Sequence, residues 1–167
     1  MNLLSTPTKI IYRPLGPADE PFLWEMLYQA IYIAPGAPAP PREIVQQPAL
    51  ARYVQGWGKA GDMGFLAVNE NTSKPAGAAW LRLLAGENCG YGYIDDATPE
   101  LSIAILPEYR GGGIGTHLLD LLLAAALDHF TAVSLSVSQD NPAIHLYQRC
   151  GFQVVSTQGD SLIMQKV

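Results

Sequence analysis

The sequence is poor in charged residues, and its positive charges are in the minority. Of its 167 residues, 15% are charged, and ten Lys and Arg stand against fifteen Asp and Glu, which gives a formal net charge of −5. Proteins that bind nucleic acid usually carry a basic patch and a high pI. The composition therefore argues against a nucleic-acid partner. An acidic balance is compatible with a cationic substrate, and equally with ordinary solubility.

Cysteine and histidine are also scarce. The two cysteines, Cys89 and Cys150, lie far apart and do not have a zinc-binding spacing, so we expect free thiols in a reducing compartment. The three histidines, His117, His129 and His145, lack metal-ligand spacing and fall in segments with a helical pattern. We expect surface or partly buried helix residues there, and no metal site.

Long hydrophobic runs are missing as well. The most apolar stretch, residues 114–126, is interrupted by Thr116, His117 and Asp120 and is shorter than the ~20 residues that a membrane span needs. The N-terminal segment lacks the basic region and apolar core of a secretion signal. We therefore expect a cytoplasmic protein without a membrane partner.

The sequence does contain an alternation of strand and helix patterns that fits one α/β domain over residues 1–167. With 49% hydrophobic residues, a chain of this length can build a core without disulfides or metals. The Pro-rich loop 34–41 is either the lip of a cleft or a plain connector. Residues 100–137 should form a right-handed parallel crossover. We expect strands at 10–12, 64–69, 75–84, 100–106, 132–137, 152–157 and 161–166, and helices at 17–31, 48–57, 113–130 and 141–150.

Four glycines precede the helix pattern that begins near residue 113. A P-loop would need a lysine after them, and a Rossmann fingerprint would need glycine where Leu118 stands, so both are excluded. One remaining interpretation is a tight turn without a ligand. The other is an anion site, because glycines let a pyrophosphate reach the free N–H groups of a helix N-terminus, next to the charge of Arg110.

Two segments decide between these interpretations. Residues 110–115, RGGGIG, resemble the (Q/R)xxGx(G/A) motif of the GNAT superfamily of N-acetyltransferases, and the lead-in from Ile103 is similar to that family's strand and turn. Residues 141–152, NPAIHLYQRCGF, are similar to the family's NxxAxxxYxxxGF segment, with Ile144 where alanine is usual. The resemblance is specific over residues 100–155 and only architectural before them.

The resemblance implies a GNAT-like mixed, splayed β-sheet of about seven strands with about four flanking helices, and acetyl-CoA as co-substrate. The pantetheine arm would pair with a strand backbone and the pyrophosphate would sit on the glycine loop beside Arg110. Asn141 would contact the CoA arm, and Tyr147 would protonate the leaving thiolate. The expected backbone contacts are Ile103, Ala104 and Ile105 for pantetheine, and Gly111, Gly112, Gly113, Ile114, Gly115 and Thr116 for the pyrophosphate.

The expected reaction is direct attack of a small-molecule primary amine on the thioester in a ternary complex. Glu100 is the candidate base, because several family members carry a glutamate there. Asp95 and Asp96 are candidate contacts to a cationic amine, or else solvated loop charges. Tyr91 and Tyr93 are candidate lining residues of the acceptor pocket, or else loop residues that only pack. No covalent intermediate is needed, in keeping with the absence of a GxSxG elbow.

Other functions remain open. A CoA-sensing domain would bind the cofactor without transferring anything, and a plain interaction domain would not bind CoA. Acetylation of a protein N-terminus is disfavoured by Ser136, which stands where such family members often have a glutamate. Homodimers are common among similar proteins, although no residue of this sequence indicates one.

Overall fold

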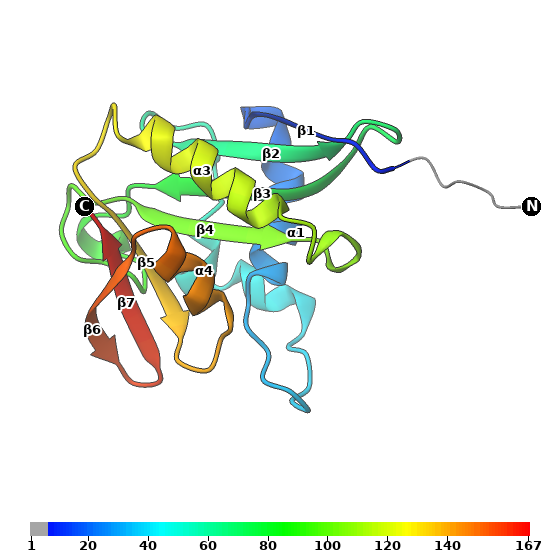
Figure 1. Ribbon diagram of the computed structural model, residues 1–167. Helices are drawn as coiled ribbons and strands as arrows, with labels where there is room; N and C mark the ends of the chain where they lie inside the picture. Colours follow the sequence, from blue (N-terminus) through cyan, green and yellow to red (C-terminus); the bar gives the residue numbers. More distant parts are fainter. Residues whose placement is uncertain (1–6) are drawn as a thin grey trace, which may run out of the picture.

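The computed structural model describes residues 7–167, which form one seven-stranded sheet with helices on both faces (Figure 1). This confirms the expected mixed α/β fold. The strands are β1 (Ile10–Pro14), β2 (Met63–Asn69), β3 (Lys74–Arg82), β4 (Glu100–Ile105), β5 (Val133–Ser138), β6 (Gln153–Gln158) and β7 (Ser161–Lys166). The helices are α1 (Glu20–Gln29), α2 (Pro48–Ala51), α3 (Ile114–Ala126) and α4 (Ala143–Arg149). No helix within residues 7–167 is long and apolar enough to cross a membrane.

The sheet is divided between β4 and β5. The strand order is β1-β2-β3-β4-β5-β7-β6, and every neighbouring pair is antiparallel except β4 and β5, which are parallel. These two strands pair only at Glu100 and Ser134, where the Ser134 N–H donates to the Pro99 carbonyl at 3.0 Å. Beyond that point they diverge, as Figure 1 shows. The expected parallel crossover and the expected splay are both confirmed.

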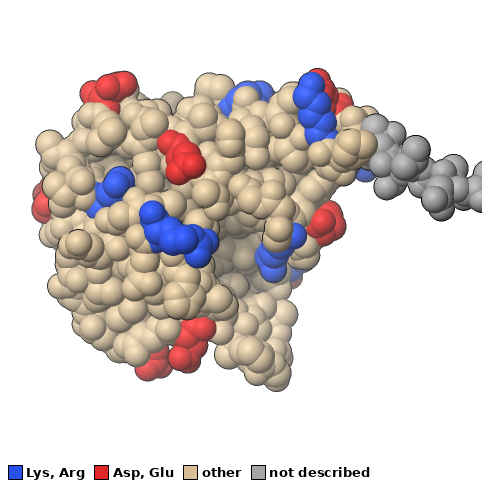
Figure 2. Space-filling model, viewed as in Figure 1, with Lys and Arg blue, Asp and Glu red and all other residues tan. Residues whose placement is uncertain are grey.

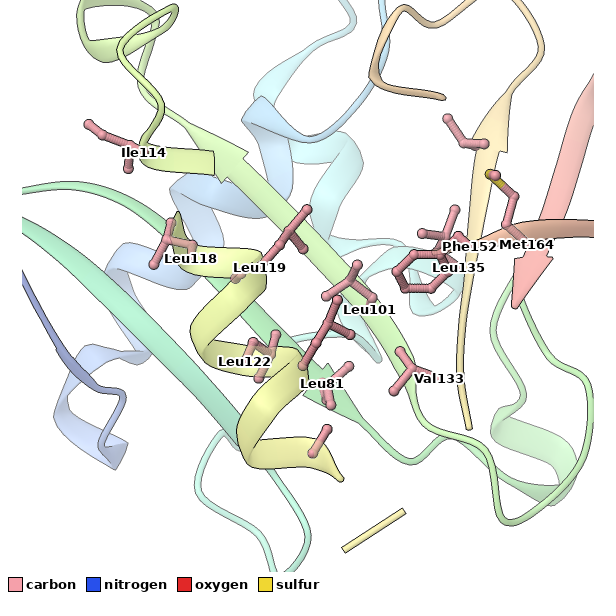
Figure 3. Close-up of a cluster of buried hydrophobic side chains, with 14 of the residues drawn as sticks. Leu81, Leu101, Ile114, Leu118, Leu119, Leu122, Val133, Leu135, Phe152 and Met164 are labelled. Atoms are coloured by element: carbon pink, nitrogen blue, oxygen red, sulfur yellow. The ribbon is translucent and has the colours of Figure 1, made fainter. Parts of the chain in front are cut away.

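Helix α3 covers one face of the sheet with a stripe of leucines. Leu118, Leu119 and Leu122 are fully buried and pack with side chains of β3, β4 and the C-terminal strands (Figure 3). Helix α1 lies on the opposite face (Figure 1), where its buried side chains pack with Trp80 and Ala104. The two cores hold β4 firmly in the sheet although its β5 side is open over most of its length.

The second expected helix is shorter than predicted. We expected helix over 48–57, but α2 ends at Ala51 and turns follow to residue 56. Tertiary hydrogen bonds explain the difference. The Arg82 guanidinium donates to the carbonyls of Arg52 and Gln55 at 3.1 and 2.7 Å, and the Trp80 indole N–H donates to the Tyr53 carbonyl at 3.0 Å.

Arg82 itself is held by a buried ion pair. Its Nε and Nη2 donate to the two carboxylate oxygens of Asp62 at 3.1 and 2.8 Å, and both side chains are 5% exposed. Arg82 lies opposite Glu100 in the β3–β4 pairing. The end of β3 therefore fixes the turn that carries Tyr53 next to the point where β4 and β5 part.

Candidate active site

Two adjoining cavities, of about 330 and 540 Å³, lie where β4 and β5 diverge. Figure 2 shows this region as a hollow between the C-terminal part of the molecule and the lobe at the lower right, with Lys and Arg beside it. The two cavities adjoin each other, because several residues line both of them. The shared residues are Ala30, Ile31, Tyr32, Ile103, Asn141 and Tyr147.

The open edge of β4 supplies free backbone groups to this cleft. The Leu106 N–H donates to the Ala76 carbonyl of β3 at 2.9 Å, whereas the Pro99 carbonyl accepts from β5. Since successive residues of a strand point their backbone groups to opposite neighbours, Ile103 and Ile105 point theirs to the cleft, where the Ile105 carbonyl also accepts a hydrogen bond from Arg110. Ala104 presents its own to β3. The strand geometry therefore gives no support to a backbone contact between Ala104 and the cofactor, although Ala104 lines the larger cavity.

The glycine loop leaves the N-terminus of α3 uncapped. Gly113 precedes the helix with φ of 84°, and no side chain caps the helix start. The first helical bond runs from the His117 N–H to the Gly113 carbonyl at 3.1 Å. The N–H groups of Ile114, Gly115 and Thr116 consequently have no partner within the helix, which is the arrangement that binds phosphate groups.

Gly115 keeps the larger cavity open. A Cβ at this position would lie 3.7 Å or more from its nearest neighbours, Leu146, Ile103 and Ile105, so the protein itself leaves room for one. The position lines the larger cavity. The missing side chain thus enlarges the space beside the helix N-terminus rather than relieving a clash.

Arg110 joins the loop to the end of β4. Its Nε donates to the Ile105 carbonyl at 3.0 Å, and its Nη2 donates to the Gln29 side chain of α1 at 3.3 Å. The side chain lines the larger cavity and is exposed. Its positive charge therefore lies at the mouth of the cleft next to the free N–H groups of α3.

Tyr147 and Asn141 come from the other side of the cleft. Asn141 accepts a hydrogen bond from the Ala143 N–H at 2.9 Å, which starts α4, and α4 directs Tyr147 into both cavities. Burial raises the pKa of Tyr147 to about 12, so the phenol keeps its proton at neutral pH. The Tyr32 hydroxyl donates to the Asp140 carbonyl at 3.1 Å and so bridges the end of α1 and the β5–α4 loop.

Glu100 lies at the base of the smaller cavity and is 2% exposed. Its carboxylate accepts hydrogen bonds from the Tyr53 hydroxyl at 2.8 Å, from the Gly92 N–H at 2.7 Å and from the Gly90 N–H at 3.0 Å. Burial raises the pKa of Glu100, and these hydrogen bonds partly oppose the rise. The residue is both a candidate proton acceptor and the anchor of the 90–92 loop.

Tyr53 is a site residue that the sequence reasoning did not assign, because it matches no motif. Tyr53 donates to Glu100 and accepts from the Tyr91 N–H at 2.8 Å. Burial, followed by the nearby Glu100 charge, raises the pKa of Tyr53. Both Tyr53 and Tyr91, the latter a candidate from the sequence, line the smaller cavity.

The other acidic candidates lie outside the two cavities. Asp95 accepts bonds from the Ala97 N–H at 2.9 Å and the Thr98 hydroxyl at 2.8 Å. Asp96 accepts one from the Tyr93 hydroxyl at 2.8 Å. None of Asp95, Asp96 or Tyr93 lines either cavity. Their contacts organise the loop before β4, and the expectation that they contact the acceptor has no support in this geometry.

The remaining polar candidates are peripheral. His117, His129 and His145 are exposed, as expected, and His117 stacks on Tyr12 with ring centroids 4.1 Å apart. Cys89 and Cys150 are free thiols. Within residues 7–167 no three His, Cys, Asp or Glu side chains gather as a metal site would require.

Known proteins share this architecture. The family model of the acetyltransferase (GNAT) family matches residues 24–152, whereas no curated protein matches the sequence. Among solved structures, PaiA N-acetyltransferase from Thermoplasma acidophilum, in complex with coenzyme A, is 21% identical, with coverage of 95% of this chain and 98% of that one and a TM-score of 0.64. A chimera of the spermidine N-acetyltransferase SpeG from Vibrio cholerae and hSSAT is 19% identical, with coverage of 96% of both chains and a TM-score of 0.62.

A third example is the acetyltransferase of GNAT family from Streptococcus pneumoniae. It is 19% identical, with coverage of 95% of this chain and 99% of that one and a TM-score of 0.61. At such identities the structures establish the common fold alone. The family model matches more than half of the chain, over the segment that builds the splayed strands, the glycine loop and α4. The chain therefore belongs to the acetyltransferase (GNAT) family.

Proposed function

We propose that the protein transfers an acetyl group from acetyl-CoA to a primary amine of a small molecule, by direct attack in a ternary complex. The observation that carries this proposal is the pair of adjoining cavities that share Tyr147 and the open edge of β4 in their linings. One cavity ends at the uncapped N-terminus of α3, and the other at Glu100. A thioester at the junction would be open to attack from the Glu100 side.

The larger cavity is the proposed CoA site. The backbone groups of Ile103 and Ile105 would pair with the pantetheine arm, and Asn141 would contact that arm from α4. The pyrophosphate would bind the backbone N–H groups of the glycine loop and the first helical turn, which are those of Gly111, Gly112, Gly113, Ile114, Gly115 and Thr116. Arg110 at the mouth would oppose its negative charge.

The smaller cavity is the proposed acceptor site, with Glu100 as the base. An ammonium group must lose a proton before its nitrogen can attack the thioester carbon. Because only 2% of Glu100 is exposed, we propose that this proton reaches the carboxylate through one water molecule. The backbone N–H of Ile103 faces the cleft and would stabilise the oxyanion that forms on the carbonyl oxygen.

Tyr147 is the proposed acid. As the tetrahedral intermediate collapses, the C–S bond breaks and the CoA sulfur leaves as a thiolate. A thiol has a lower pKa than a buried phenol, so the transfer of the Tyr147 proton is coupled to departure of the sulfur rather than preceding it. The attacking nitrogen is cationic in the tetrahedral intermediate and gives up a second proton, which passes through water to the Tyr147 phenolate, while Glu100 releases the first proton to solvent. No acetylated enzyme forms.

The Tyr147→Phe variant tests this function. We expect kcat to fall about 100-fold, the lower range for general acid catalysis, while the calorimetric Kd for CoA changes little. Tyr12→Phe is the matched control, since Tyr12 lies outside both cavities and should retain full activity. An unchanged kcat of Tyr147→Phe across the pH range would contradict the acid role. Tight CoA binding by the unmodified protein without transfer to any amine would instead indicate a CoA sensor.

A further inference from the structure

We propose that the acceptor is a small amine with a single positive charge and an uncharged body that is aromatic or apolar over much of its length. This inference rests on the proposed function and concerns the smaller cavity. Its volume of about 330 Å³ is at the small end of the range for ligand sites, which suits a small molecule.

The charge inventory of the smaller cavity limits the charge of the acceptor. Among the described residues that line it, Glu100 is the one charged side chain. One carboxylate offsets one ammonium group. A second ammonium would lose its water without gaining a partner in the lining. A carboxylate on the acceptor would meet the negative charge of Glu100 with no cation in the lining, because Arg52, whose charge lowers the pKa of Glu100, lies outside this cavity.

The Glu100 carboxylate is held in place by hydrogen bonds and cannot move toward a second ammonium group of an acceptor. Its carboxylate oxygens accept from Tyr53, Gly90 and Gly92 at 2.7–3.0 Å. A Cβ on Gly90 would lie 2.3 Å from one of these oxygens, so the loop packs directly on the carboxylate. The nearest other acids in sequence, Asp95 and Asp96, lie outside the cavity. The site thus presents one fixed negative charge.

The lining of the smaller cavity indicates the body of the acceptor. It includes the apolar side chains of Leu27, Ile31 and Leu50 and that of Tyr91, a residue that is 54% exposed. Exposed aromatic rings at a cavity are available for stacking on a flat ligand. Ser136 and other serines add neutral hydroxyl groups. Apart from Glu100, the lining residues are uncharged.

Two matched pairs of amines test the proposal, with kcat/KM measured as CoA release from acetyl-CoA. Phenethylamine and phenylalanine differ by a carboxylate, and pentylamine and cadaverine differ by a second ammonium. We expect phenethylamine to exceed phenylalanine, and pentylamine to exceed cadaverine, each by at least about 10-fold, because the additional charge is unpaired in the cavity. Equal or reversed preferences in either pair would overturn the proposal.

A designed second acid sharpens the test. Ser136 lies two residues beyond Ser134, which pairs with Glu100, and hence about 7 Å along the strand. Ser136→Asp should reduce the discrimination against cadaverine about 10-fold while pentylamine is still acetylated. In a second variant, Tyr91→Ala, the KM for phenethylamine should rise more than that for pentylamine. A Ser136→Asp variant that acetylates pentylamine yet keeps the full discrimination would contradict the charge argument.

Failure of the inference and failure of the proposed function are distinguishable. Transfer confined to polyamines, amino acids or peptides would overturn the inference on the acceptor and leave acetyl transfer intact. Absence of transfer to every amine, with CoA still bound, would overturn both.

Discussion

Glu100 joins two properties in one side chain, since it anchors the 90–92 loop and is the proposed base. A base acts only when deprotonated, and burial raises the pKa of Glu100 above its ordinary value of 4.5. We therefore expect kcat to fall as the pH is lowered through this raised pKa. Glu100→Gln should lower the plateau of kcat about 100-fold and remove that acidic limb from a plot of kcat against pH. Retention of the limb in the variant would assign it to another group.

Neighbouring glycines of the α3 loop differ in what they require. Gly113 has φ of 84°, where an alanine is strained by about 1–2 kcal/mol, whereas Gly112 is outside that region and a Cβ there would lie 3.8 Å from the Tyr109 carbonyl oxygen. Gly113→Ala should weaken CoA binding about 10-fold in calorimetry, and the matched control Gly112→Ala less than about threefold. Equal losses would mean that loop conformation does not set the affinity for CoA.

Gly111 also has a positive φ, of 82°, which favours glycine. The motif allows any residue at this position, so the sequence did not predict this requirement.

The predictable site residues are those that belong to local motifs. Arg110, Gly113 and Tyr147 stand at fixed spacings in the two recognised segments, so the sequence alone predicted them as candidates. Tyr53 reaches the cleft because Trp80 and Arg82 of β3 hold the carbonyls of its turn. That dependence links residues far apart in the chain, and no local pattern records it.

At the scale of elements, α3 is stabilised by its buried leucine face. Leu118 is fully buried between α3 and the sheet (Figure 3). Leu127, just beyond the helix, is 69% exposed. Leu118→Ala should reduce the free energy of unfolding by about 2–5 kcal/mol in urea denaturation, because it leaves a cavity in the core. The control Leu127→Ala should change it by no more than about 0.5 kcal/mol. Similar losses for both would contradict the assigned packing.

The elements were predicted with different success for physical reasons. The strands alternate apolar and polar residues or are short buried runs, and both patterns are visible locally. The helix expected over 48–57 was too long because the carbonyls of its second half bond Arg82 and Trp80 instead of helical N–H groups. The splay between β4 and β5 came from the family resemblance, since strand pairing depends on partners that are distant in sequence.

At the scale of the whole molecule, the single point of pairing between β4 and β5 creates the proposed site. Helix α3, which packs on β2, β3 and β4, and the glycine loop approach the opening from one side, and α4 approaches it from the other. The Tyr32–Asp140 hydrogen bond links the two sides across it. Such a cleft can hold both reactants at once, which direct transfer requires.

The most direct test of the central claim is a two-substrate kinetic analysis combined with intact-protein mass spectrometry. Acetyl-CoA and the fastest-reacting amine from a screen of primary amines would be varied against each other. The proposed ternary complex predicts intersecting double-reciprocal lines, and no acetylated protein after incubation with acetyl-CoA alone. Parallel lines, together with a protein that carries an acetyl group, would show a covalent intermediate and contradict direct transfer.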